Sequence, residues 1–198
     1  MTTGAIILSA GSGRRIAKLG IKPLLKIDGK TFLETIIDKL EHSGFTPIVV
    51  VVNPNHHAAM KTLRHNAQLC VNQHHALGML SSLRCGLSHI EKSTRGFMLH
   101  PVDFPLVMPE TYDALMSTHQ KHEACIVKPS FGGRRGHPVI FPRQFYHDLT
   151  RAPINEGARW VQKQHPDQII SVIVNDPGIL ININTPELYE EHCAKHQY

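Results

Sequence analysis

A short apolar run that leads into a glycine-rich turn and then into positive charge opens the chain. Residues 5–8 (Ala-Ile-Ile-Leu) are continuously hydrophobic, as is typical of a strand buried on both faces of a parallel sheet. Residues 9–13 (Ser-Ala-Gly-Ser-Gly) follow, and such small residues let backbone N–H groups approach a ligand closely. The next residues include the cations Arg14, Arg15, Lys18 and Lys22. This order predicts an α/β fold with a site for nucleotide phosphates where the first strand ends.

Two familiar phosphate-binding patterns do not fit this turn. A P-loop requires G-x-x-x-x-G-K-[ST], which the sequence lacks. A dinucleotide fingerprint requires G-x-G-x-x-G, but Ile16 stands where the third glycine belongs, and the second apolar run ends in Asn53 instead of an acidic residue. An ordinary strand-to-helix turn with a solvated basic surface remains as the alternative. Such a turn needs no cations, so we favour a phosphate site.

The size and charge of the chain limit its partners. A chain of 198 residues can bury a sizeable core, and we expect residues 1–198 to form a single domain. There are 21 basic and 16 acidic residues, a formal net charge of +5. Much of the positive charge lies in two clusters, residues 14–22 and 128–135, which favours a small polyanion over a nucleic acid. No apolar run is long enough to span a membrane.

The N-terminus and the cysteines predict a cytoplasmic location. Residues 1–3 lead straight into the first strand, which leaves no room for a signal peptide. The cysteines show no C-x-x-C spacing, so we expect isolated thiols, as a reducing compartment favours. They are Cys70, Cys85, Cys125 and Cys193.

A second informative stretch covers residues 72–87. Apolar residues recur there at helical spacing, so we expect a helix to begin near Met79. Gly78, Ser81 and Ser82 lie at its N-terminus, where free N–H groups and hydroxyls bind polar groups. From the spacing alone, a ligand site at this N-terminus and an ordinary capped surface helix are equally favoured.

Two later stretches contain charged residues that are candidates for a ligand site. Asp103 falls just past a strand expected at residues 96–99, where an open α/β sheet places ligand groups. Its neighbours are apolar, which argues against an exposed turn. Residues 128–138 contain three glycines and two arginines and predict a flexible cationic loop, which could also be mobile surface alone.

Alternating helices and strands fill the rest of the chain. Thr31 and Glu34 form a capping box at the start of a helix, and Thr185 with Pro186 predicts the start of the last one. Further strands are expected at residues 47–52, 69–71, 124–127 and 168–175, and further helices at 56–65, from 109, at 143–149 and at 156–165. These elements predict a mostly parallel central sheet with helices on both faces.

A series of motifs along the chain resembles, in order, those of the molybdopterin nucleotidyltransferases, a MobA-like NTP transferase family, and more broadly those of the nucleotide-sugar pyrophosphorylases. The family's opening, L-[AS]-[AG]-G-x-[SG]-x-R-[MF]-G followed by K-x-L-L, is matched except that Ile16 and Ala17 replace the usual Met-Gly. N-P-x-x-x-x-G-M-x-x-S-L-x-x-G-L is matched from Asn72, with Gln73 for the proline. D-x-P-L-V and G-R-R-G-H-P-V are also present. In D-I-D-T-P-E-D, Asn182 and Asn184 replace both aspartates.

The resemblance implies a single Rossmann-like nucleotidyltransferase domain and Mg²⁺-dependent transfer of a nucleoside monophosphate from an NTP to an acceptor phosphate. It implies that Arg14, Lys22 and Asp103 are catalytic and that Asp103 and Asn184 hold the metal. It places the nucleotide on Ser9, Ala10, Gly11, Ser12, Gly13, Arg14, Lys22, Gly78, Ser81 and Ser82. It places the acceptor on Arg134, Arg135 and His137.

The resemblance also suggests substrates. Ala10 stands where guanylyl-transferring relatives carry glycine, which favours CTP; molybdopterin is the expected acceptor, an acceptor molybdoenzyme is a possible partner, and neither nucleic acid nor a membrane is expected. A sugar phosphate is the alternative acceptor. The two asparagines support a third reading, a nucleotide-binding protein without catalysis. Because Mg²⁺ often takes only one or two carboxylates together with substrate phosphates, we expect an enzyme.

Overall fold

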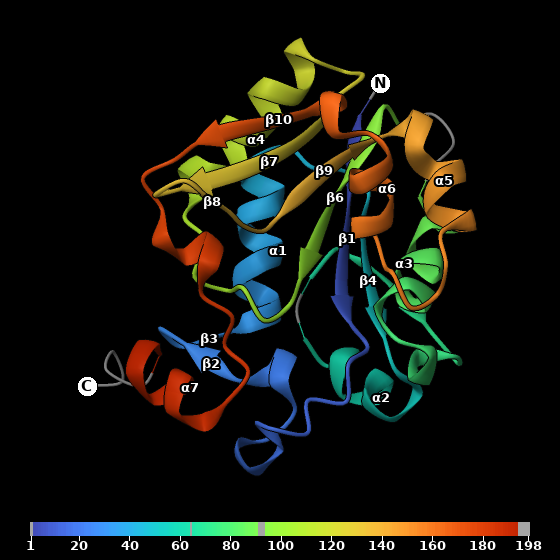
Figure 1. The fold of residues 1–198 in the computed structure, drawn as a ribbon. Coiled ribbons are helices and arrows are strands. Elements are labelled where there is room, and N and C mark those ends of the chain that lie inside the picture. The colour runs from blue at the N-terminus through green and yellow to red at the C-terminus, as the bar shows by residue number, and fades with distance from the viewer. Residues whose placement is uncertain (1, 64, 91–93, 194–198) are drawn as a thin grey trace.

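One sheet organises the computed structural model, which describes residues 2–63, 65–90 and 94–193 (Figure 1). Its strands follow the order β10-β7-β9-β6-β1-β4-β5, and β8 pairs with β7. β1, β4, β5 and β6 run parallel to one another, as do β7 and β10, whereas β9 is antiparallel to both β6 and β7. The expected mostly parallel sheet is confirmed. The bounds are β1 Thr3–Ser9, β4 Ile48–Val52, β5 Gln68–Val71, β6 Gly96–Pro101, β7 Ile126–Phe131, β8 Arg134–Arg135, β9 Val139–Pro142 and β10 Ile169–Ile173.

Helices cover both faces of the sheet because the strands are apolar on both. In β1, Ile7 belongs to the core shared with α1 and α4, while Ile6 and Leu8 belong to the core shared with α3, α5 and α6. This division follows the two-residue period of a strand. Figure 1 shows α1 and α4 on one side and α3, α5 and α6 on the other. Their bounds are α1 Phe32–His42, α3 Met79–Leu87, α4 Pro109–Lys121, α5 Tyr146–Arg151 and α6 Arg159–Gln164.

Smaller elements gather at the carboxyl end of β1. They are the ribbon β2 (Lys26–Ile27) and β3 (Lys30–Thr31), and the helices α2 (His57–Met60) and α7 (Pro186–His192). The hydroxyl of Tyr189 on α7 donates to the carbonyl of Lys26 at 2.8 Å, which fixes α7 beside the ribbon (Figure 1). The helix expected at residues 56–65 is shorter than predicted, since among the described residues of that range only α2 is α-helical.

Both predicted helix starts are confirmed. The backbone N–H of Glu34 donates to the Thr31 hydroxyl at 3.1 Å, and the Thr31 N–H donates to the Glu34 carboxylate at 3.0 Å. This reciprocal pair satisfies two donors at the start of α1. The Thr185 hydroxyl accepts from Leu188 N–H, and Pro186 occupies the first helical position of α7.

The loop predicted at residues 128–138 is partly a hairpin. β7 continues as a strand to Phe131, because it pairs with β10 on one side and with β8 beyond the turn. Gly132 and Gly133 make that turn with φ angles of 55° and 75°, a left-handed conformation that favours glycine. Lys128 therefore lies in a strand, and its side chain has a fixed direction.

The expectation of four isolated thiols is wrong for two of them. Cys70 on β5 and Cys85 on α3 form a disulfide. α3 packs over β4 and β5, so the fold brings together two cysteines whose spacing in the sequence gives no sign of a pair. Cys125 and Cys193 are free. The cytoplasmic location and the single domain remain predictions. Within the described part of the chain, no helix combines the length and hydrophobicity needed to cross a bilayer.

Candidate functional site

The carboxyl ends of the central parallel strands meet at one edge of the sheet. Ser9 at the end of β1 is in register with Val52 of β4, and Leu8 is in register with Pro101 of β6. The glycine-rich turn therefore leaves the sheet beside the loop that carries Asp103. This is the edge where open α/β sheets bind ligands, and we call residues 9–22 together with Asp103 the phosphate edge.

The glycine-rich turn is held by a buried residue on its inner side and is exposed to solvent on its outer side. Ile16 is fully buried beneath it, and its backbone N–H donates to the Gly13 carbonyl at 3.0 Å. Gly13 has a φ angle of 57°, which lets the turn reverse at little cost. Ile16, the departure from the family pattern, thus serves as a core anchor. Gly11, Ser12 and Arg14 are exposed, while Ser9 and Ala10 are buried.

Asn53 stands where a dinucleotide-binding protein would carry an acid, and it has a different task. It is buried, and its side-chain oxygen accepts from His56 N–H at 3.1 Å, capping a short turn after β4. Its Nδ2 donates to the carbonyl of Ala10 at 3.5 Å. Asn53 therefore helps to position the glycine-rich turn, and its side-chain amide is already hydrogen-bonded within the protein.

Lys22 and Asp103 form an ion pair across this edge. Lys22 Nζ lies 3.3 Å from Asp103 Oδ2, and the two side chains are 14% and 21% exposed. A Cβ at Gly13 would lie 3.8 Å from the Cβ of Lys22, so the glycine-rich turn packs directly against this lysine. The structure thus brings together one cation and one anion from segments 81 residues apart, beside exposed backbone.

The C-terminal segment supplies amide oxygens next to Asp103. The Ile183 N–H donates to the Asp103 carbonyl at 2.8 Å, which places Asn182 and Asn184 on either side of that contact. Asn184 is half-buried, and the buried Oδ1 of Asn182 has no hydrogen-bond partner among the described residues. Carboxylate and amide oxygens are the ligand type that Mg²⁺ prefers.

These donors fit a metal that is shared with a substrate. In the described ranges, three or more His, Cys, Asp or Glu side chains nowhere gather as a metal-binding group. Mg²⁺ needs six oxygen ligands, and it commonly takes one or two carboxylates with phosphates and waters for the rest. Asp103 with Asn182 and Asn184 suits this arrangement, whereas a metal bound by protein side chains alone would need more charge.

The loop after Asp103 is fixed by a buried carboxylate. Asp176 is 2% exposed and accepts hydrogen bonds from Met108 N–H at 2.8 Å, the Thr111 hydroxyl at 2.7 Å and Gly178 N–H at 2.8 Å. Because Asp176 begins the segment that leads to Asn182, one side chain joins the two candidate metal-binding segments. Sequence reasoning missed Asp176, since two of its three partners, Met108 and Thr111, lie more than sixty residues away.

Lys39 supports the same loop from α1. Its Nζ donates to the carbonyls of Pro105 at 2.9 Å and Val107 at 2.8 Å. Burial lowers its pKa. These two bonds satisfy carbonyls that turn away from the sheet, so α1 contributes directly to the position of the Asp103 loop.

The serines at the start of α3 form hydrogen bonds within the protein. Asn72 Nδ2 donates to the hydroxyls of Ser81 at 2.9 Å and Ser82 at 3.0 Å. The Ser81 hydroxyl also lies 2.8 Å from the Gly78 carbonyl and 2.9 Å from that of His74. The two serines predicted to bind the base thus shape the loop of residues 72–78, and exposed Gly78 lies at the end of this loop.

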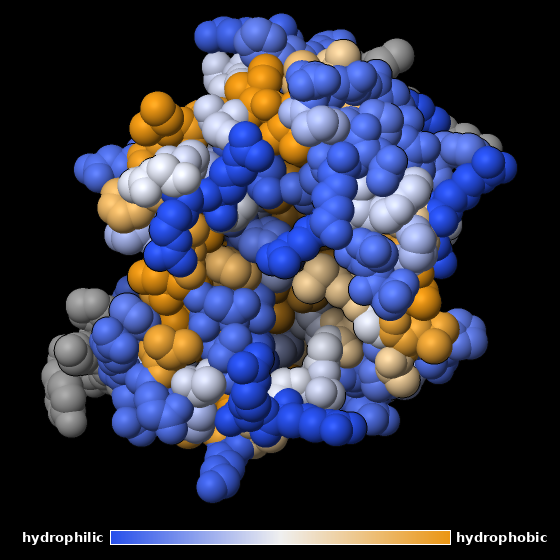
Figure 2. Space-filling model, viewed as in Figure 1, coloured by the Kyte–Doolittle hydropathy of each residue, from blue (hydrophilic) through white to orange (hydrophobic). Residues whose placement is uncertain are grey.

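A cleft of about 590 Å³ opens beside Asp103. It lies between Gly78 with its neighbours, the segment 134–137 after β7, and α6 with the turn before it. Figure 2 shows it as a hollow in the middle of this face, with hydrophilic residues on its rim and hydrophobic ones deeper. Phe104, which follows Asp103 directly, lines the cleft, so the phosphate edge and the cleft are neighbours.

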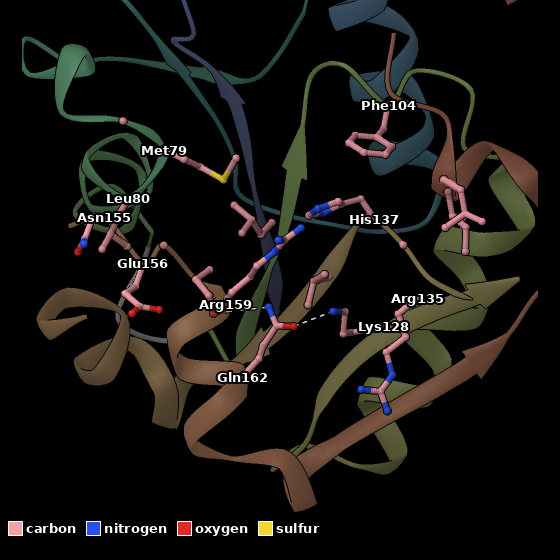
Figure 3. A pocket seen from close by; sticks show the side chains of 18 of the residues that line it. Met79, Leu80, Phe104, Lys128, Arg135, His137, Asn155, Glu156, Arg159 and Gln162 are labelled. Atoms are coloured by element: carbon pink, nitrogen blue, oxygen red, sulfur yellow. Dashed lines mark hydrogen bonds between the residues drawn. The ribbon is translucent and has the colours of Figure 1, made fainter. Parts of the chain in front are cut away.

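The three predicted acceptor residues differ in direction. The His137 ring lies 4.9 Å from the Phe104 ring and faces into the cleft (Figure 3). Burial lowers its pKa to about 4, so the imidazole is neutral at physiological pH. Arg135 donates from Nε to the Ser171 hydroxyl at 2.8 Å and points towards β10. Arg134 is exposed at the rim.

The cleft contains residues that the sequence did not single out. Lys128 Nζ donates to Gln162 Oε1 at 2.7 Å, and Arg159 extends from α6 towards His137 (Figure 3). Burial, with the charges of Arg135 and Arg159, lowers the pKa of Lys128 to about 8. The basic cluster at residues 128–135 was a signal for Lys128, but no local pattern pointed to Arg159 or Gln162.

Comparison with known proteins agrees with this geometry. Residues 5–169 match the model of the MobA-like NTP transferase domain. The chain is 32% identical over 200 residues to the bifunctional protein GlmU of Alkaliphilus metalliredigens, covering all of this chain and 43% of that protein. The chain therefore spans less than half of that relative's length.

Two solved structures share the fold over nearly the whole chain. Rv0371c from Mycobacterium tuberculosis superposes with a TM-score of 0.82 at 19% identity, over 96% of this chain and 97% of that one; a complex of Rv0371c with manganese is also known. The molybdopterin-guanine dinucleotide biosynthesis protein A of Archaeoglobus fulgidus superposes with a TM-score of 0.68 at 19% identity, over 96% of each chain.

Proposed function

The chain belongs to the MobA-like NTP transferase family, and from this premise we propose that it transfers a nucleoside monophosphate from an NTP to a phosphorylated acceptor. The observation that carries the proposal is the Lys22–Asp103 pair, 3.3 Å apart and directly against the glycine-rich turn. A cation for phosphate and an anion for a metal meet there at the carboxyl ends of parallel strands. Such charges position and neutralise a triphosphate.

Each part of the phosphate edge has a role in this reaction. The exposed backbone of Gly11, Ser12 and Gly13, together with Arg14, would bind the triphosphate oxygens. Lys22 would turn from Asp103 to the phosphates, and Asp103 with Asn182 and Asn184 would hold Mg²⁺. When bound, Mg²⁺ supplies charge neutralisation at the phosphate oxygens. The manganese complex of Rv0371c supports a divalent metal.

The acceptor enters from the neighbouring cleft. An oxygen of its phosphate forms a bond to the α-phosphorus while the bond from that phosphorus to the bridging oxygen breaks, and pyrophosphate leaves with the electron pair. No side chain forms a covalent bond, because positioning and charge neutralisation account for most phosphoryl-transfer catalysis. His137, neutral and next to Phe104, would face the attacking phosphate.

For substrates we propose CTP and molybdopterin. Ala10 at the glycine-rich turn supports cytosine, and the similarity to a molybdopterin-guanine dinucleotide biosynthesis protein supports the acceptor. A sugar phosphate is the second candidate, because Asn155, Glu156 and Gln162 line the cleft with groups that hydrogen-bond hydroxyls.

The test is pyrophosphate release with each of the four NTPs, Mg²⁺ and either molybdopterin or a set of sugar phosphates. We expect release with CTP and molybdopterin above all other pairs. Release with a sugar phosphate alone would replace the acceptor. NTP binding without release from any pair would support the third reading, a nucleotide-binding protein without catalysis.

A further inference from the structure

The cleft gathers positive charge that the described residues do not balance with an ion pair. Lys128 on β7, Arg159 on α6 and His137 approach one another there (Figure 3). Neither Lys128 nor Arg159 forms an ion pair with any residue that the structure describes. Glu156 also lines the cleft, but its carboxylate lies 3.2 Å from Lys163 Nζ and is already paired.

The position of Lys128 is set by a neutral partner. Gln162 Oε1 accepts from Lys128 at 2.7 Å, and Gln162 Nε2 donates to the Ala158 carbonyl at 3.5 Å, which fixes which end of the amide faces the lysine. Arg159 and Gln162 are three residues apart on α6 and share one helix face. An ammonium has three donors, so Gln162 directs Lys128 and leaves two of its donors for a ligand.

The surroundings strengthen the attraction between these cations and any anion bound there. Leu80, Leu99 and Val139 line the cleft and are almost fully buried, so they provide a floor of low polarity. Charge attraction is several times stronger in such a setting than in water. The proximity of Arg135 and Arg159 also disfavours the charged form of Lys128, and an anion between these cations would remove that repulsion.

We propose that Lys128 and Arg159 bind a second anionic group of the acceptor, distinct from the phosphate that reacts near Asp103. This inference rests on the proposed transfer reaction for the identity of the ligand. The acceptor class is then a molecule with a reacting phosphate at one end and a second anionic group, such as a phosphate, a carboxylate or the dithiolate of molybdopterin, at the other. The hydrophobic walls of the cleft contact the part between them, and Arg159 and Lys128 select acceptors by length and charge.

Lysine-by-lysine labelling tests the anion site without any acceptor. The intact protein is treated with an amine-specific reagent in trace amounts, and the labelling of each lysine is read by peptide mass spectrometry as pH is varied. An anion beside Lys128 raises its pKa, and a rise of about one unit slows labelling near pH 7 about tenfold. Inorganic phosphate and acetate are the two probes, with chloride at matched ionic strength as the reference and exposed Lys61 as the internal standard.

Two variants complete the design. Arg159→Met should abolish the response of Lys128 to either probe, whereas Arg151→Met, an exposed arginine outside the cleft, should leave it intact. A response to phosphate alone or to acetate alone identifies the anion. Unchanged Lys128 labelling with both probes, or an equal response in Arg159→Met, overturns the proposal.

The labelling of Lys22 in the same samples separates this proposal from the transfer reaction. CTP with Mg²⁺ should protect Lys22. Protection of Lys22 with no response at Lys128 would retain the nucleotidyltransferase and reject the second anion site. A response at Lys128 without protection of Lys22 by any NTP would retain the anion site and reject the transfer reaction.

Turnover separates the second anion from the reacting phosphate. With molybdopterin as acceptor, Arg159→Met should raise the acceptor KM about tenfold, as expected when about 1.4 kcal/mol of binding is lost. The kcat should stay within about twofold, because an interaction made equally before and during reaction changes only binding. A fall in kcat with unchanged KM would place Arg159 at the reacting phosphate and overturn the proposal.

Discussion

The phosphate edge and the cleft lie side by side but are built in opposite ways. At the phosphate edge the positive charge of Lys22 is paired with Asp103, and exposed backbone provides most other donors. In the cleft, Lys128 and Arg159 have no anionic partner among the described residues, and the donors are side chains. The charge of Lys22 is therefore balanced before a ligand binds, whereas the charges of Lys128 and Arg159 are balanced only by a ligand. Lys22 and Asp103 are held in place before the nucleotide arrives, while Lys128 and Arg159 remain available to the acceptor.

The largest expected effect on turnover comes from Asp103→Asn at the phosphate edge. Asp103 is the only carboxylate among the three proposed metal ligands, so its loss should remove most of the metal. Losing about 3–4 kcal/mol of transition-state stabilisation slows turnover two to three orders of magnitude, at about 1.36 kcal/mol per decade. Pyrophosphate release at saturating NTP and Mg²⁺ measures this. Asp113→Asn, an exposed acid on α4, is the matched control and should behave as wild type. An Asp103→Asn protein that keeps a tenth of the turnover contradicts the metal assignment.

Asp176→Ala should produce the largest loss of stability. Its carboxylate satisfies three donors, two of them buried and one part-buried, and leaving such donors unsatisfied costs about 2–4 kcal/mol in total. In a chain of this size that lowers the melting temperature by about 4–16 °C. The exposed Asp167→Ala is the control. A variant that melts within a degree or two of wild type would show that Asp176 does not hold the two metal-binding segments together.

The two regions should separate cleanly in nucleotide binding. Lys22→Ala removes a charge-assisted contact worth about 1.5–3 kcal/mol, which weakens NTP affinity by roughly ten- to a hundred-fold. Lys128→Ala carries the same change in the cleft and should leave NTP affinity unchanged. Calorimetric titration with CTP and Mg²⁺ measures both. Equal losses from the two variants would merge the regions into one site, and a loss below about threefold for Lys22→Ala would remove Lys22 from the triphosphate.

Substitutions at Asn182 and Asn184 change the charge of the proposed metal site and should have a smaller effect on turnover than Asp103→Asn. Asn184→Asp adds the carboxylate that the family carries and should lower the Mg²⁺ concentration needed for half-maximal turnover, whereas Asn184→Leu should raise it. The same pair at Asn182, whose Oδ1 has no partner in the described part of the chain, shows which amide is the ligand. Equal Mg²⁺ dependence in all variants would exclude both asparagines from the metal site.

Local sequence predicted the phosphate edge better than the cleft, for a physical reason. The residues of the edge follow strand ends, so the apolar runs of β1 and β6 already place Asp103 beside the glycine-rich turn. Arg159 reaches the cleft only because β7, β9 and α6 pack together, and nothing within a few residues of it signals that packing. The Cys70–Cys85 pair was missed for the same reason.

Resemblance to the family predicted roles for single residues, and the structure adds contacts that the motifs do not indicate. Ser81 and Ser82 lie where the base-binding motif predicts, but their hydroxyls hold Asn72 and backbone carbonyls. Ile16 departs from the motif and still anchors the turn in the core. A motif fixes the path of the backbone, whereas the partner of a hydroxyl depends on side chains that the motif leaves open.

The smallest expected effect concerns the stability cost of an unbalanced charge, and Lys128→Met measures it. The pKa of Lys128 is about 8 in the folded protein, below the ordinary value of 10.5. Below pH 8 the lysine is charged in both states, so folding bears the cost of the lowered pKa. Because Lys128 is only partly buried, solvent screening reduces this cost to about 2 kcal/mol. As pH rises from 8 to 10.5, the unfolded state binds the extra proton, and the cost disappears.

Methionine removes that cost but leaves Gln162 Oε1 without its donor, and because this hydrogen bond is only part-buried the loss is about 1 kcal/mol. The net expectation is a variant about 1 kcal/mol more stable than wild type near pH 7, or 2–4 °C in melting temperature, and less stable than wild type near pH 10.5. Lys22→Met at the phosphate edge should instead be less stable than wild type, because it leaves Asp103 without its partner. Melting curves across this pH range measure both variants. A Lys128→Met protein that is less stable at every pH would mean that the cleft does not carry unbalanced charge, and the contrast between the two regions would fail.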